Sequence, residues 1–329
     1  MSGVRAAGSG RGARRLRDLD EFALIDRIAR AARRSGAASD PAVRLGIGDD
    51  AAVLRARGRA DWVVSCDARV EDVHFRWRSE SPRTVGRTAL VAALSDLAAM
   101  GARPRAFTCA LAAPDTLPLA RLDGLLAGLL REARRHRCPL VGGNLTRARE
   151  TSLTLTVCGE VAPGGALRRR ARLGDRVLVT GVLGASALAR ARAERGAGAM
   201  RHVPTPRLRA GRALARTAGV RGCIDVSDGL AADLGHLLGR GRRCPFDPER
   251  VPRPRGFDAA CRRLGLDPLE LALGGGDDYE LLFAVAPGAP SAAALSRRLG
   301  VRVSELGRVS RGAAPHGPGG WGHFARTES

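Results

Sequence analysis

The chain contains no lysine, and all 55 of its basic residues are arginine. A Walker A loop needs a lysine at the nucleotide phosphates, a protein kinase needs its strand lysine, and a Schiff-base enzyme needs an amine. All three classes are therefore excluded. Aromatic residues are also scarce, at 3%, so the interior must be built mainly from Ala, Leu and Val, packed around many glycines.

Acidic residues are too few to balance the arginines, and the formal net charge is +22. A basic surface gains affinity for nucleic acid by releasing counterions from the phosphates. Here the arginines are scattered through predicted helices, and no recognition motif with interleaved aromatics accompanies them. We therefore interpret the charge as a compositional bias and expect no nucleic-acid partner.

The sequence also lacks long apolar runs and closely spaced cysteine pairs. No run approaches the ~18 to 20 residues of a membrane span, and the N-terminus has no apolar secretory segment. The seven cysteines include no CxxC pair, which predicts reduced thiols. We expect a cytoplasmic protein with no membrane contact. Residues 1–17 are rich in Gly, Arg and Ser, which predicts a disordered tail, with a transit peptide as the alternative.

The 329 residues suit two domains that share one cleft. Helices and strands mix without strict alternation, which predicts an α/β fold of mixed α+β layers and not a doubly wound sheet. A change of composition near residue 163 divides an N-terminal domain (18–162) from a C-terminal domain (163–329). Periodicity predicts helices over 20–34, 82–100, 119–137, 185–195, 208–218 and 230–238, and strands over 63–64, 106–111, 140–141, 151–157, 176–180, 223–226 and 281–285.

Aspartates recur beside glycine or at the ends of predicted strands and helices. Mg²⁺ prefers oxygen ligands and usually takes one or two carboxylates together with substrate phosphates. Several aspartates from distant segments therefore suit a cleft that binds a nucleotide and several cations. Any single one has an alternative role in a turn or a helix cap. The positions are Asp49, Asp50, Asp67, Asp96, Asp225, Asp228, Asp277 and Asp278.

A role in a turn or a helix cap is least suitable for Asp96, because this residue lies in the middle of an apolar helical run where capping is not available. A buried charge there needs a partner, and a bound cation would supply one. By contrast, Ser227 or Asp228 could simply cap the helix that follows them. The Gly142-Gly143-Asn144 segment would let the backbone approach a phosphate, although two adjacent glycines are weak evidence.

Seven motifs, taken in chain order, resemble the thiamine-monophosphate kinase family. This family belongs to the superfamily of aminoimidazole ribonucleotide synthetase, selenide water dikinase and a hydrogenase maturation factor. The resemblance spans the chain, and the run from Ser95 to Ala102 is its most specific part. The motifs are Gly46 to Ala51, Ser65 to Phe75, Ser95 to Ala102, Gly142 to Asn144, Asp225 to Leu230, Asp278 to Phe283 and Gly320 to Phe324.

The resemblance implies phosphorylation of thiamine monophosphate by ATP in a homodimer, with several Mg²⁺ ions. The transfer it implies is direct and in line, and needs no dedicated catalytic side chain. It also implies that Trp321 stacks on a thiamine ring. The metal ligands it implies are Asp50, Ser65, Cys66, Asp67, Asp96, Asn144, Asp225 and Asp228, the ATP contacts are Gly143, Asn144, Arg168 and Ser227, and the acceptor contacts are His74, Asp277 and Trp321.

Three positions depart from the family pattern. Asn144 and Asp277 stand where the family usually has Asp and Glu, and Cys66 stands where Thr is common. These changes leave open another small acceptor, or a non-catalytic paralogue that only binds nucleotide or thiamine phosphates. A purine-pathway synthetase is disfavoured by the Asp278 to Leu282 run and the terminal Trp321. A selenide dikinase would need a reactive residue earlier than Cys66.

Overall fold

The computed structural model describes residues 25, 26, 29, 30, 34, 41–56, 58 and 60–312. The chain divides into two units, Met1–Ala38 with Gly322–Ser329, and Ser39–Trp321. The account below concerns the described part of the second unit. The predictions for the 1–17 tail, for Trp321 and for its flanking motif lie outside the described residues, as does most of the expected helix over 20–34.

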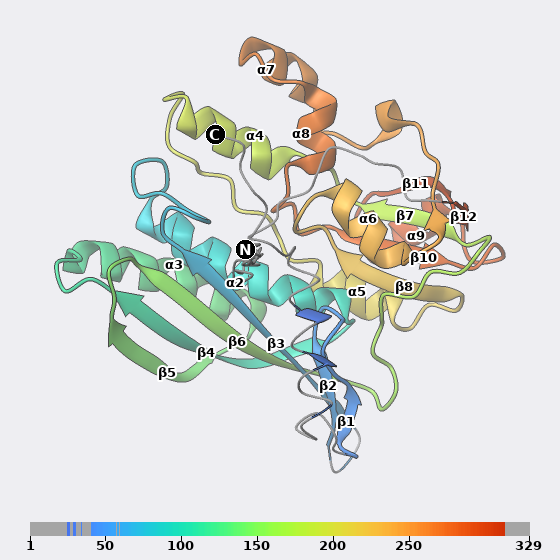
Figure 1. The fold of residues 1–329 in the computed structure, drawn as a ribbon, viewed down its shortest axis with the longest axis horizontal. Coiled ribbons are helices and arrows are strands. Elements are labelled where there is room, and N and C mark those ends of the chain that lie inside the picture. Colours follow the sequence, from blue (N-terminus) through green and yellow to red (C-terminus); the bar gives the residue numbers. More distant parts are fainter. Residues whose placement is uncertain are drawn as a thin grey trace, which may run out of the picture. The chain divides into compact units, whose positions relative to one another are not determined.

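A six-stranded sheet occupies the first half of this unit, in the order β1-β2-β3-β6-β4-β5 (Figure 1). Only β4 and β5 run parallel; the other neighbouring strands are antiparallel. Burial alternates along β6, so one face of the sheet is packed and the other is partly open. The strands are β1 (Val43–Leu45), β2 (Ala52–Arg55), β3 (Asp61–Val70), β4 (Arg103–Ala113), β5 (Leu140–Arg147) and β6 (Ser152–Val161).

Two helices, α2 (Pro82–Ala99) and α3 (Leu119–His136), pack on the buried face of this sheet. The side chain of Ser81 caps α2 by accepting the N–H of Thr84, and proline begins the helix. A Cβ on Gly86 of α2 would lie 2.0 Å from the carbonyl oxygen of Leu125 in α3. Glycine therefore permits the close approach of the two helices.

The second half contains a four-stranded antiparallel sheet in the order β11-β7-β10-β8. Strands β7 and β10 are buried along their whole length, as expected for strands covered on both faces. The strands are β7 (Arg176–Thr180), β8 (Val220–Asp225), β10 (Leu281–Val285) and β11 (Val303–Arg308), and a small pair is formed by β9 (Arg242–Arg243) and β12 (Ser310–Arg311).

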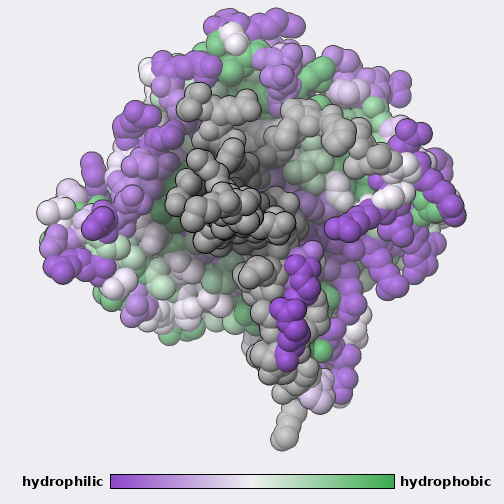
Figure 2. All heavy atoms as spheres, in the orientation of Figure 1, coloured by the Kyte–Doolittle hydropathy of each residue, from purple (hydrophilic) through white to green (hydrophobic). Residues whose placement is uncertain are grey.

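Helices and one 3-10 turn surround this second sheet (Figure 1). On the face of the molecule shown in Figure 2, hydrophilic residues cover much of the coloured surface, which agrees with the scattered arginines of the sequence. The elements are α4 (Ala185–Glu194), α5 (Leu208–Leu214), α6 (Leu230–Leu238), the 3-10 turn η2 (Pro248–Arg250), α7 (Phe257–Arg263), α8 (Pro268–Gly274) and α9 (Ala292–Leu299).

The expected mixed α/β fold is confirmed, and one apolar cluster joins its two sheets. Leu94 and Leu97 of α2 share that cluster with Cys223 of β8 and Phe283 of β10. The elements on either side are thus held by common packing. The boundary at residue 163 falls between the two sheets and stays a prediction.

Some predicted elements have different lengths in the structure. Strand β3 continues to Val70 and does not end at residues 65–67, and β5 extends to Arg147, so Gly143 and Asn144 lie inside a strand. Helix α5 ends at Leu214, short of the predicted end. No helix in the described ranges is both long and apolar enough to cross a membrane.

Candidate functional site

Four aspartates from separate segments come together where the first sheet, α2 and β8 meet. Asp50 lies in the turn before β2, Asp67 on β3, Asp96 on α2 and Asp225 at the end of β8. On α2, all residues from Thr84 to Met100 are buried except Arg87 and Asp96, which are partly exposed. The fold therefore brings Asp96 to the edge of the core, where it faces other carboxylates.

The pKa values of these carboxylates reflect their burial and their mutual repulsion. Burial, followed by the charge of Asp225, raises the pKa of both Asp50 and Asp96 well above the ordinary value. Burial also raises the pKa of Asp225 to about 6, and Asp67 adds to that rise. Asp50 Oδ2 and Asp225 Oδ2 are buried without a hydrogen-bond partner among the described residues. Such oxygens are costly unless a cation or a proton compensates them.

Ser65 connects two of these segments through its hydroxyl group. Its Oγ lies 2.5 Å from Asp96 Oδ2 and 3.2 Å from the backbone oxygen of Asp50. One hydroxyl proton can serve only one of these acceptors at a time. Because side chains alternate along a strand, Ser65 shares its face of β3 with Asp67. The predicted Ser65, Asp50, Asp67, Asp96 and Asp225 are thus brought together.

Arginine lies beside the first acidic turn. Arg169 Nε is 3.6 Å from Asp49 Oδ1 and 3.7 Å from Asp50 Oδ1, and its Nη2 donates to the oxygen of Gly48. The predicted Arg168 is exposed, and its backbone oxygen accepts the N–H of Cys223 on β8. Among the described residues, the guanidinium group that contacts the acidic turn is therefore that of Arg169. The predicted contact of Arg168 with ATP stays a prediction.

The turn between β8 and α6 is organised differently from the expected cap. Gly229, with φ of 110°, precedes α6, and no side chain caps this helix. Instead, Asp233 Oδ2 inside the helix accepts the N–H groups of Ser227 and Asp228, at 3.0 and 3.1 Å. The hypothesis that Ser227 or Asp228 is the N-cap is wrong, because a helical carboxylate reaches back to their backbone. Their own side chains are left partly exposed.

A second group of predicted residues meets beside Arg69, which is 5% exposed on β3. Arg69 Nη2 donates to the backbone oxygen of His74 at 2.9 Å, and Nη1 lies 3.6 Å from Asp277 Oδ1. Tyr279 donates to Asp277 at 2.7 Å, and Arg190 also pairs with Asp277. Burial opposes ionisation here, but Arg69 and Arg190 lower the pKa of Asp277. Thus His74 and Asp277, which lie far apart in sequence, are linked through the buried guanidinium group of Arg69.

Two predicted ligands do not reach the aspartates with their side chains. Cys66 is exposed on the opposite face of β3 from Ser65 and Asp67, and its sulfur contacts Thr156. Only its backbone remains available to that site. Asn144 on β5 pairs with Ala110 on β4, which pairs with Thr154 on β6, and Thr154 pairs with Ala68 on β3. Asn144 therefore lies on the open face, three strands and about 14 Å from β3.

No group of three or more His, Cys, Asp or Glu side chains in the described residues is arranged to hold a metal ion. The aspartates lie near enough to perturb one another's pKa without forming such a shell. We missed Arg69, Arg169, Arg190 and Asp233 from the sequence. The one sequence signal for Arg69 was its place two residues after Asp67, which puts both on the same face of a strand.

Strand β5 borders an apolar groove of about 380 Å³ between itself and α3. Its walls include Gly143, Leu125 and Leu129, and a Cβ on Gly143 would lie 1.9 Å from the oxygen of Cys109. The glycine is therefore required by close packing against β4. The neighbouring Val141 and Leu145 are 64% and 79% exposed.

Comparison with known proteins shows which proteins this chain is similar to. Residues 48–161 match the family described as AIR synthase related protein, N-terminal domain. The thiamine-monophosphate kinase of Mycobacterium tuberculosis is 38% identical over 278 residues, which cover 81% of each chain. That of Aquifex aeolicus is 31% identical over 94% of this chain and all of its own.

The solved structure of AaThiL complexed with AMPPCP and TMP superposes with a TM-score of 0.78. It is 28% identical and covers 95% of this chain and 99% of its own. The likeness thus extends over both sheets, beyond the region of the N-terminal domain match. With relatives above 30% identity over most of their length, the chain belongs to the thiamine-monophosphate kinase family.

Proposed function

We propose that this chain transfers the γ-phosphoryl group of ATP to thiamine monophosphate and forms thiamine diphosphate. The observation that carries the proposal is the convergence of Asp50, Asp67, Asp96 and Asp225 from four segments, two of them with unpaired buried oxygens. Phosphoryl transfer depends mainly on positioning and on neutralising charge. The family's kinases and the complex of AaThiL with AMPPCP and TMP support ATP and thiamine monophosphate as the substrates.

The carboxylates fit divalent cations better than any other partner. The pKa values of Asp50, Asp96 and Asp225 are raised, and two of their buried oxygens have no hydrogen-bond partner among the described residues. Both features are expected of carboxylates that bind a hard cation when no cation compensates their charge. When bound, Mg²⁺ ions would neutralise the phosphates and polarise them for attack. We propose Asp50, Asp67, Asp96, Asp225 and Asp228 as ligands, with Ser65 through its hydroxyl and Cys66 through its backbone. Asn144 remains an untested prediction.

The residues of this chain bind and orient both substrates. A phosphate monoester is already ionised near neutral pH, so its oxygen can attack without a protein base. We propose that Arg168 and the partly exposed side chain of Ser227 hold ATP. Gly143 lies beside Asn144 on β5, three strands from β3, and its contact with ATP stays a prediction. The acceptor then lies against His74 and Asp277, which Arg69 keeps in fixed relative positions. In-line transfer would need these two groups of residues to hold the attacker and the leaving group on opposite sides of the γ-phosphorus.

A homodimer is supported by the exposed edge of the first sheet. Within the described ranges, strand β5 has a neighbour on one side only, and all eight of its residues are exposed. An unpaired edge with exposed Val141 and Leu145 favours association with another chain. We propose that a second copy covers this edge and the groove beside it. The seven unpaired cysteines suit a cytoplasmic location.

The acceptor can be tested with a panel of phosphate acceptors. Purified chain is incubated with Mg-ATP and either thiamine monophosphate, thiamine or adenosine monophosphate, and ADP is followed by a coupled assay. We expect ADP above the acceptor-free rate only with thiamine monophosphate. ADP formation with another member of the panel would assign a divergent acceptor. ATP binding without turnover on any would assign a non-catalytic paralogue.

A further inference from the structure

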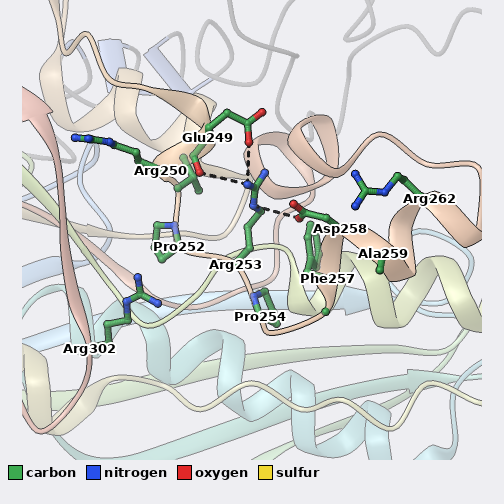
Figure 3. A pocket seen from close by; sticks show the side chains of 12 residues that line it. Glu249, Arg250, Pro252, Arg253, Pro254, Phe257, Asp258, Ala259, Arg262 and Arg302 are labelled. Carbon is green, nitrogen blue, oxygen red and sulfur yellow. Dashed lines mark hydrogen bonds and ion pairs between the residues drawn. The ribbon is translucent and has the colours of Figure 1, made fainter.

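A second hollow, of about 620 Å³, lies in the second half of the chain, outside the aspartate site (Figure 3). Residues 249–254 and 256–259, with Arg262 and Arg302, form its walls. Its volume lies within the range of pockets that bind small molecules. Pro252 and the buried Phe257 supply an apolar floor, while most of the remaining wall is charged.

The charges in this hollow do not cancel. Arg253 is 13% exposed and already paired, with Nη2 3.0 Å from Glu249 Oε2 and Nε 3.3 Å from Asp258 Oδ1. Figure 3 shows Arg253 between these two acids, with Arg262 and Arg302 on opposite sides of it. Neither Arg262 nor Arg302 has a side-chain hydrogen bond or ion pair within the described part of the chain. Both acids of the wall pair with Arg253, and Arg250 pairs with Asp247. The exposed guanidinium groups of Arg262 and Arg302, from separate segments, are left without a partner among the described residues.

The walls of the hollow are hydrogen-bonded to the turn 181–184, which also contacts Asp278. The N–H groups of Gly181 and Leu183 donate to the backbone oxygens of Arg302 and Pro252, each at 2.8 Å. The next residue, Gly184, donates its N–H to Asp278 Oδ2 at 2.6 Å. Asp278 is the neighbour of Asp277.

Packing strengthens the same connection. A Cβ on Gly184 would lie 2.6 Å from Cζ of Phe257, so the ring of the pocket floor rests directly on this turn. Gly184 has φ of 88°, which favours glycine there for backbone reasons as well. A change at the pocket walls therefore reaches the turn 181–184 through two hydrogen bonds and one close contact.

We propose that this hollow binds the phosphate group of a small phosphorylated molecule between Arg262 and Arg302, and that binding holds the turn 181–184. Guanidinium groups bind phosphate oxygens through paired, charge-assisted hydrogen bonds, and two of them facing one space suit a dianion. The site is separate from the ATP and acceptor site of the proposed function, and its binding does not depend on that function.

The probe is inorganic pyrophosphate, titrated by calorimetry into the full chain with EDTA and about 150 mM salt. Salt at this level screens isolated surface arginines, and the uncompensated aspartates repel anions when no divalent cation is present. We expect one saturable site that Arg302→Ala and Arg262→Ala each weaken by at least about tenfold. Arg131→Ala, which removes an exposed arginine from α3, is the matched control and should leave affinity unchanged.

Amide hydrogen exchange measures the effect on the turn in the same samples. Pyrophosphate should slow exchange in the peptide that contains residues 181–184 severalfold in the wild type, and not in Arg302→Ala. The proposal is overturned if no saturable binding occurs, if both variants bind as the wild type does, or if binding leaves exchange of this turn unchanged. Because no turnover is measured, these outcomes are independent of whether the chain is a kinase.

Discussion

Replacing Asp225 by Asn should make the cation-free protein more stable while removing its activity. Asp225 is 3% exposed, one of its oxygens has no partner within the described residues, and Asp67 repels it. Asn keeps the shape of the side chain and removes the charge. A carboxylate kept for structure would behave in the opposite way, because its loss would destabilise the fold.

The size of the gain follows from the pKa. A rise from 3.8 in the unfolded chain to about 6 in the fold corresponds to about 3 kcal/mol of lost stability once both states are ionised. The folded state holds its proton more tightly, so the free energy of unfolding falls as pH rises between these two values. Asp225→Asn should therefore add up to about 3 kcal/mol at pH 7.5 and little below pH 4.

The assay is urea unfolding in EDTA at both pH values, together with turnover in Mg-ATP and thiamine monophosphate. We expect turnover to fall by on the order of 100-fold or more. Asp175→Asn is the control: Asp175 accepts the N–H of Arg172 and pairs with Arg221, so its loss should cost about 1 to 3 kcal/mol. An Asp225→Asn protein that is less stable at pH 7.5, or that keeps wild-type turnover, would refute the reasoning.

Three further predictions concern other parts of the chain. Glu132 is fully buried, and its pKa is about 2 because the pairing with His136, 3.3 Å away, and the hydrogen bond from Arg87 outweigh its burial. Glu132→Gln should therefore cost about 3 kcal/mol at pH 7 and nothing below pH 2 in urea unfolding; equal stability of the two proteins at pH 7 would contradict this. Arg69→Met should raise the acceptor KM more than it lowers kcat, with partial rescue in Arg69→Lys, whereas a uniform loss of folded protein would assign a merely structural role. Asn144→Asp should leave turnover within about twofold, because its side chain lies on the open face of the sheet; a gain of tenfold or more would show that a second copy brings it to the phosphates.

The sequence was sufficient where a residue conflicted with its own local pattern. Asp96 interrupts an apolar helix, and that conflict alone predicted that its side chain needs a partner; in the structure it accepts the Ser65 hydroxyl and lies among other carboxylates. The limits of strands β7 and β10 and of helix α6 also matched. The two strands are short, mainly apolar runs, α6 repeats leucine at helical spacing, and turn residues bound all three. Local signals sufficed in these cases since the local and tertiary preferences agree.

Contacts between distant segments could not be derived in this way. Arg69 and Tyr279 are 210 residues apart, and nothing local to either indicates the other. The face occupied by Asn144 depends on the length and register of β5, and a shift of one residue would reverse it. At Asp228 the local pattern was ambiguous: the helix begins after Gly229, and Asp233 inside it accepts the backbone N–H of Asp228.

The most direct test of the proposed activity is the stoichiometry of one reaction. Purified full-length protein is incubated with Mg-ATP and thiamine monophosphate, and ADP and thiamine diphosphate are quantified together by chromatography. Our account predicts that the two products appear in equal amounts and only when both substrates are present. ADP without thiamine diphosphate, or neither product, would contradict it.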